Sequence, residues 1–182
     1  LIYASRNSKI PNGIRSIGEF AFTPYTRQVI IPTSVTHIHR RAFANLHTSE
    51  LIIPTGVTEI EEYAFEHSSI GKITIANTIT HISKGTFACC KTREIVIPDG
   101  VETIESDAFY GCRGLNGKLT IPQSVTAIND CAFKDCKVLK VAPINTNTTE
   151  MRPKEDGICD KCGEQLVKRA DDNEETYMDR YN

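Results

Sequence analysis

Residues 53–65 read IPTGVTEIEEYAF, and the same pattern of residue types occurs in six successive units of the chain. Each unit begins with an isoleucine and ends with a phenylalanine, and the starting residues are Ile10, Ile31, Ile53, Ile75, Ile97 and Ile121. From Ile31 to Ile97 the starts are 22 residues apart. A fixed period of this length is typical of a solenoid, in which each unit forms one coil that packs only on its neighbours.

A short alternating segment precedes the starting isoleucine of most units. Examples are ELII at residues 50–53, KITI at 72–75, EIVI at 94–97 and KLTI at 118–121. Alternation with β-branched residues predicts a strand whose second and fourth members point inward. A proline follows the starting isoleucine in five of the six units. Proline lacks the N–H that a sheet needs, so the strands before Pro32, Pro54, Pro98 and Pro122 are expected to stop there.

The second half of each unit carries another apolar pair and then closes on Ala-Phe. We expect a short helical or irregular turn at this point, because three or four residues do not make a stable α-helix. Since equivalent residues of stacked coils lie side by side, the closing phenylalanines are predicted to form one aromatic ladder in the core, made of Phe22, Phe43, Phe65, Phe87, Phe109 and Phe133.

The units resemble the BspA-like leucine-rich repeats, whose pattern runs strand, Ile/Leu-Pro, Val-Thr-x-Ile, Ala-Phe, Cys. The resemblance covers residues 8 to about 141, with departures such as Ala76 in place of proline and Thr86 in place of alanine. It implies an α/β, mostly β, right-handed solenoid with one short parallel strand in each coil of about 22 residues.

Two rows of side chains are expected on the outer side of these strands. The first row is the candidate protein-binding row and contains Ile30, Ile52, Thr74, Val96 and Thr120. An exposed apolar stripe often marks an interaction surface, although β-propensity alone also accounts for these residue types. The second row contains Glu50, Lys72, Glu94 and Lys118, and its alternating charges favour strand register and solubility.

The composition and motifs of the chain argue against three classes of protein: nucleic-acid-binding proteins, helical membrane proteins and enzymes. The formal net charge of −2 gives no support for nucleic acid as a partner, and no apolar stretch approaches the length of a transmembrane helix. The repeats contain no Ser-His-Asp pattern, no glycine-rich phosphate loop and no paired carboxylates in an evident cleft, so no catalytic residue is predicted. His37, His39 and His81 are interpreted as surface residues rather than metal ligands.

A non-catalytic protein-binding module is therefore the preferred hypothesis. By resemblance, the partner is a host-matrix or cell-surface protein and the location is extracellular or at the cell surface, with a role in adhesion. The chain begins Leu-Ile-Tyr-Ala-Ser without a signal peptide, which indicates either that an export signal has been removed or that the chain is a fragment.

Three of the seven cysteines share one position of the repeat. Cys90, Cys112 and Cys136 each follow the closing phenylalanine by three residues. A small apolar core position explains this column, because a free cysteine packs as a small hydrophobic residue. The expected spacing of stacked coils does not exclude a disulfide within the column, and free core thiols are the preferred interpretation.

The periodicity ends near Pro143, which gives three predicted parts: a solenoid at 1–143 with six repeats and a partial seventh, a linker at 144–151 and a tail at 152–182. The tail resembles the lid segment of zinc-type adenylate kinases. By that resemblance Cys159 and Cys162 match one pair of zinc ligands, which makes zinc the one possible cofactor, and Arg169 and Arg180 match phosphate-contacting arginines.

Two alternatives to the binding module follow. The repeats could be an insertion or accessory segment of an adenylate-kinase-like enzyme, or they could be a structural spacer. This chain alone is expected to have no kinase activity, because it contains neither the partner cysteine pair of the lid nor a phosphate-binding loop.

Overall fold

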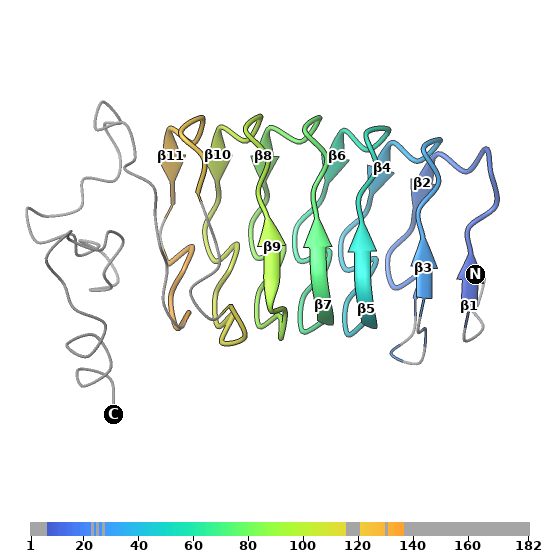
Figure 1. The fold of residues 1–182 in the computed structure, drawn as a ribbon, viewed down its shortest axis with the longest axis horizontal. Helices are drawn as coiled ribbons and strands as arrows, with labels where there is room; N and C mark the ends of the chain where they lie inside the picture. Colours follow the sequence, from blue (N-terminus) through green and yellow to red (C-terminus); the bar gives the residue numbers. More distant parts are fainter. Residues whose placement is uncertain are drawn as a thin grey trace, which may run out of the picture.

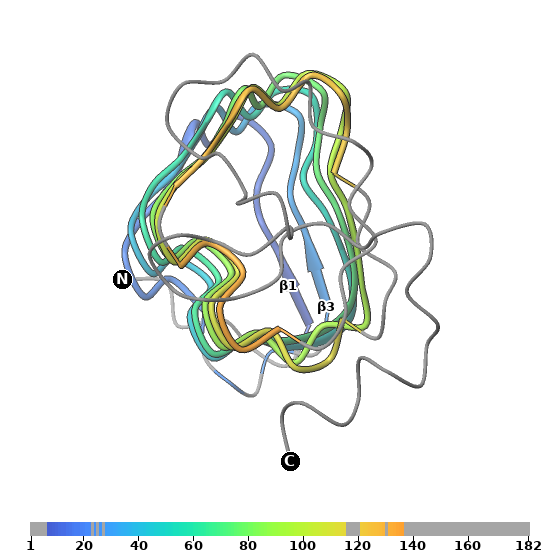
Figure 2. The ribbon, with the colours of Figure 1, turned by 90° about the vertical axis from the view of Figure 1, so that its left-hand side faces the viewer.

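The computed structural model describes residues 7–22, 24, 26, 28–115, 121–129 and 131–136. Thr120, Cys159, Cys162, Arg169 and Arg180 lie outside these residues, as do the predicted linker and tail. The described residues form strands and turns and contain no helix. Their coils stack side by side along one axis (Figure 1), and seen along that axis the coils superimpose (Figure 2).

One side of the solenoid carries the strands that the alternating segments predict. They are β1 (Asn7–Lys9), β3 (Gln28–Ile30), β5 (His47–Ile52), β7 (Ser69–Thr74) and β9 (Glu94–Val96). β1 pairs with β3, and β7 pairs with both β5 and β9, always in parallel. β3 lies beside β5 in the stack (Figure 1). We call the outward side of these strands the strand face.

The predicted register is confirmed. Glu50 lies opposite Lys72, and Lys72 lies opposite Glu94. Ile52 lies opposite Thr74, which in turn lies opposite Val96. Residues 22 positions apart are therefore side by side, as a one-coil-per-repeat solenoid requires.

The return half of each coil contains a second, two-residue strand, in addition to the single strand expected. These strands are β2 (Ser16–Ile17), β4 (His37–Ile38), β6 (Glu59–Ile60), β8 (His81–Ile82), β10 (Thr103–Ile104) and β11 (Ala127–Ile128). They pair in parallel in the orders β2-β4-β6 and β8-β10-β11, with the isoleucines buried. We call the outward side of these strands the return face.

The aromatic ladder is confirmed. Adjacent rings of the six closing phenylalanines are stacked at centroid distances of 4.8, 5.1, 5.3, 5.3 and 5.1 Å, with interplanar angles of at most 17°. Phe43, Phe65, Phe87 and Phe109 are completely buried. The backbone supports the stack, because the N–H of Phe65 donates to the carbonyl of Thr86 at 2.9 Å and that of Phe87 donates to Ala108 at 2.8 Å.

The cysteine column consists of free thiols, as interpreted from the sequence. The thiols of Cys90, Cys112 and Cys136 donate to the carbonyls of Phe65, Phe87 and Phe109 at 3.0, 2.9 and 2.9 Å. Hydrogen bonding with Cys136 and Cys90, together with burial, raises the pKa of the Cys112 thiol well above its usual range. This thiol is therefore protonated at neutral pH and acts as a packing group.

Replacing one ring of the ladder tests the role of the stack. Phe87→Ala should lower the free energy of unfolding by roughly 3–5 kcal/mol, because it leaves a cavity between two stacked rings. Chemical denaturation followed by circular dichroism measures this change. The matched control is Phe20→Ala, since Phe20 is 55% exposed and outside the stack. Equal losses of stability in the two variants would contradict the stacked-core interpretation.

Candidate interaction surface

The strand face carries the predicted apolar row on the outside of the sheet. Because side chains alternate along a strand, Leu51, Ile73 and Ile95 point into the core and their neighbours point outward. Ile30 and Ile52 are each 56% exposed and Val96 is 43% exposed, while Thr74 between them is half-buried. The structure therefore brings four of the five predicted row residues together, and the fifth, Thr120, lies outside the described residues.

Beside this row lies the predicted row of charges. The ammonium of Lys72 forms an ion pair with the carboxylate of Glu94 at 3.0 Å. Glu50 lies opposite Lys72 in register, but the lysine pairs with Glu94 instead. Both partners of the ion pair are more than 40% exposed, so the pair contributes little to stability. The charged row therefore makes the surface beside the apolar row polar.

The return face is built differently, because its charged groups bind neighbouring coils to each other. His37 pairs with Glu59 at 3.2 Å, and His39 pairs with Glu61 at 2.8 Å. The other oxygen of the Glu61 carboxylate accepts the backbone N–H of Arg40 at 2.7 Å. These histidines are thus surface residues, as interpreted from the sequence.

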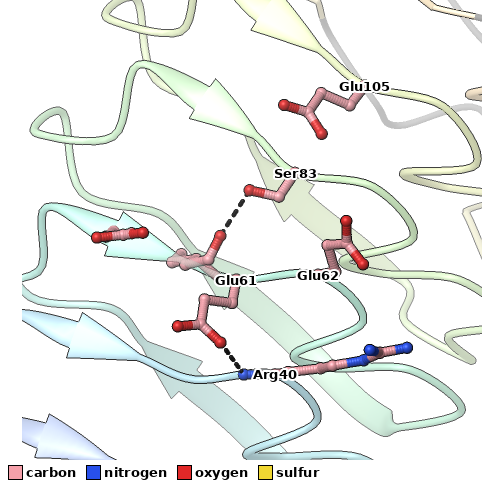
Figure 3. Close-up of a pocket in the computed structure, with 7 residues that line it drawn as sticks. Arg40, Glu61, Glu62, Ser83 and Glu105 are labelled. Atoms are coloured by element: carbon pink, nitrogen blue, oxygen red, sulfur yellow. Dashed lines mark hydrogen bonds between the residues drawn. The ribbon is translucent and has the colours of Figure 1, made fainter.

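An open hollow of about 400 Å³ lies among these groups on the return face (Figure 3). Four glutamates, one arginine, one isoleucine and one serine line the hollow. They are Glu59, Glu61, Glu62, Glu105, Arg40, Ile60 and Ser83. Glu61 and Glu105 cap backbone N–H groups of the preceding coil, at Arg40 and Lys84. The Ser83 hydroxyl donates to the Ile60 carbonyl at 2.6 Å. These polar groups hold adjacent coils together.

The hollow was not predicted from the sequence. A signal existed, since Glu61 and Glu105 occupy the same position in two units and have the length to reach the backbone of the preceding coil. Among the residues that the structure describes, no group of three or more histidines, cysteines or carboxylates is arranged to hold a metal ion. The described part of the chain also contains no helix suited to crossing a membrane.

Comparison with known families identifies two matching models. The BspA type leucine rich repeat region matches residues 4–116 and 116–154, in six copies. The active site lid of adenylate kinase matches residues 147–171, a small part of the chain. Among curated proteins, no match is found.

Two solved structures of leucine-rich repeat proteins are similar to this chain. One is from Bacteroides ovatus, with a TM-score of 0.61, 21% sequence identity and 79% of this chain covered. The other is from Eubacterium ventriosum, with a TM-score of 0.55, 17% identity and 84% of this chain covered. The match spans 47% of each of those proteins, so this chain corresponds to about half of their length. At this identity the likeness establishes the fold.

The carboxylate of Glu61 gives a pH-dependent test of the coil-to-coil bonds. Its hydrogen bond with His39, followed by the one from the Arg40 N–H, lowers the pKa of Glu61. A lowered pKa adds stability above the unfolded-state pKa of about 4.3, and this stability is lost as the pH falls through the lower folded-state pKa. Glu61→Gln should therefore destabilise the protein by about 0.5–1 kcal/mol near neutral pH, with the difference shrinking below about pH 4.

Urea denaturation of wild type and variant from pH 3 to pH 7 measures this difference. Glu62→Gln is the matched control, because Glu62 is an exposed neighbour in the same coil and lines the same hollow. A loss of stability in Glu61→Gln that stays constant across the pH range would show that the carboxylate charge is not the stabilising element.

Proposed function

The chain belongs to the family of BspA type leucine-rich repeat proteins, and on that premise we propose that it is a non-catalytic protein-binding module acting through the strand face. The observation that carries the proposal is the exposed apolar row of Ile30, Ile52 and Val96. Ile52 and Val96 lie on the sheet β5-β7-β9 in fixed register, and Ile30 lies on the neighbouring strand β3. Aligned apolar side chains on a rigid surface favour docking of another macromolecule.

The core does not require these side chains to be apolar. Thr74 occupies the same row between Ile52 and Val96, which demonstrates that a polar side chain fits there without a change of register. Glutamate, lysine and glutamine occupy the adjacent row. The core therefore does not require the isoleucines and the valine of the outer row, and contact with a partner would give them a role.

The partner that we propose is a host-matrix or cell-surface protein, with the chain located outside the cell or at its surface and acting in adhesion. Support comes from family membership, because BspA-like proteins are commonly exported or surface proteins with adhesive roles. The apolar row with charged neighbours also resembles the ordinary anatomy of a protein–protein interface, in which an apolar centre is flanked by polar groups.

A second candidate function is supported by the lid match over residues 147–171. In this alternative the repeats are an accessory segment of a nucleotide kinase, Arg169 and Arg180 contact phosphates, and Cys159 and Cys162 hold zinc with two further ligands. Isothermal titration with ATP and zinc analysis of the purified chain test it. ATP binding together with one equivalent of zinc would favour this alternative. The absence of both ATP binding and zinc would favour the binding module or a structural spacer.

Charge introduced into the apolar row tests the proposed binding face. Ile52→Glu combined with Val96→Glu should reduce binding to immobilised collagen, laminin or fibronectin by at least roughly tenfold, because carboxylates in the centre of the interface have to be desolvated. Biolayer interferometry measures the affinity for each protein. Both side chains are exposed, so the thermal unfolding midpoint should stay close to that of wild type.

The control is Thr55→Glu combined with Asn77→Glu, which introduces the same charge at exposed turn residues of two neighbouring coils. It should bind as wild type does. A folded Ile52/Val96 variant that retains full affinity would contradict the strand-face proposal, and absence of binding by the wild-type chain to matrix and cell-surface proteins would favour the spacer.

A further inference from the structure

Three exposed cations lie together where the last described coils enter the strand side of the solenoid. Arg93 directly precedes β9, and Lys91 lies two residues before Arg93. The third cation is Arg113, in the following coil. We call these three residues the basic strip. The same repeat position in the next unit is Lys137, which lies outside the described residues and is not included in the strip.

Backbone hydrogen bonds fix where the strip residues lie. The backbone N–H of Lys91 donates to the carbonyl of Ser68 at 2.9 Å, and the backbone N–H of Arg93 donates to the carbonyl of Gly71 at 3.3 Å. Lys91 follows Cys90 and Arg113 follows Cys112, two cysteines whose thiols bind equivalent phenylalanine carbonyls. Lys91 and Arg113 therefore occupy equivalent positions in adjacent coils, which stack about 5 Å apart.

The strip differs from the charged row of the strand face, in which a lysine pairs with a glutamate of the next coil. Two cations elsewhere are paired across adjacent coils, Lys72 with Glu94 at 3.0 Å and Arg41 with Glu66 at 3.1 Å. Other described cations, among them Arg15 and Lys84, form no ion pair with a described carboxylate, but they do not adjoin the apolar row. Within the described part of the chain, none of the three strip residues forms an ion pair with a carboxylate. Like charges in adjacent coils repel each other, so the strip lacks the stabilising role of the other charged rows.

The strip is continuous with the strand face. Arg93 directly precedes β9, and Val96 of the apolar row is the last residue of that strand. Glu94 lies between them in the chain, but its carboxylate is paired with Lys72. A ligand that covers the apolar row at β9 therefore reaches unpaired guanidinium and ammonium groups at the other end of the same strand.

We propose that the basic strip binds the carboxylates of an acidic segment of a polypeptide partner, whose apolar side chains pack on the row of Ile52 and Val96. This inference rests on the proposed protein-binding function and specifies the chemistry of the partner. Arginine presents a planar set of N–H donors that matches the two oxygens of a carboxylate, which makes Arg93 and Arg113 suited to this ligand.

A polypeptide fits this surface better than a nucleic acid or a sulfated glycan. The strip contains three cations, whereas the chain has a formal net charge of −2 and places Glu50 and Glu94 on the same face. A long polyanion would meet these carboxylates as soon as it extended past the strip. A short acidic segment followed by apolar residues places its carboxylates only at the strip, and the carboxylate of Glu94 between the strip and Val96 is paired with Lys72.

A labelled peptide tests the strip directly. The probe is a fluorescein-labelled oligoglutamate peptide, and its fluorescence anisotropy is titrated with the intact chain at low salt. Wild type should bind, and the affinity should decrease as the salt concentration rises. Arg93→Ala combined with Arg113→Ala should weaken binding roughly tenfold or more, since two charge-assisted contacts are removed.

The matched control is Arg15→Ala combined with Lys84→Ala. These exposed cations lie outside the strip, and their loss changes the net charge by the same amount. The control should bind within about twofold of wild type, because long-range attraction is weak next to direct pairing. Arg93→Lys combined with Arg113→Lys should recover part of the affinity, since the charge is kept and the bidentate geometry is lost.

Several outcomes would overturn the inference. Equal weakening in the strip variant and the control would show that net charge alone governs binding. Absence of oligoglutamate binding by wild type, with labelled heparin bound through the strip, would assign the strip to a sulfated glycan. Binding of neither probe would leave the strip without an anionic ligand.

This experiment is independent of the matrix-protein assay. Oligoglutamate contains no apolar side chain, so its binding does not require the apolar row. Loss of oligoglutamate binding with matrix binding retained contradicts the basic strip alone. The reverse result contradicts the proposed function and leaves the strip as an anion site.

Discussion

The stack of phenylalanine rings from Phe22 to Phe133 joins each described coil to the next, at the same one-coil offset that the other columns of the solenoid follow. A coil of about 22 residues cannot bury its apolar side chains alone, since its two flat sides are open. Stacking closes both sides, and the parallel strands and Ala-Phe turns then form backbone hydrogen bonds at the same repeat distance. Any residue that faces inward is thereby constrained in size and polarity.

The outward positions are free of this constraint, and the two faces use that freedom differently. On the return face, charged side chains bind neighbouring coils: His39 pairs with Glu61, and Glu105 accepts the N–H of Lys84. The carboxylates around the hollow are thus largely engaged in holding the solenoid together. On the strand face, Ile30 and Ile52 have no such use and remain more than half exposed. This contrast favours the strand face over the hollow as the interaction surface.

The sequence predicted the columns in which one residue type recurs at a fixed repeat position, and it missed the second strand of each coil and the contacts between unlike residues. The register, the phenylalanine ladder and the thiol column each follow from one residue type in successive units. Left-handed backbone at Tyr63 and His67 was not predicted, although it recurs at two fixed repeat positions that hold Gly85 and Gly111 in later coils. The ring of Tyr63 occupies the space that a side chain on Gly85 would need, a relation visible only once the coils are stacked.

The position of the basic strip has a consequence for how a partner lies on the strand face. The apolar side chains of the row, Ile30, Ile52 and Val96, are similar in size and polarity and carry no charge. By itself the row would accept a bound segment in either orientation. Lys91, Arg93 and Arg113 occur towards only one end of the described coils, so an acidic group on the partner aligns with that end. The apolar row then supplies contact area, and the basic strip determines the orientation of the partner.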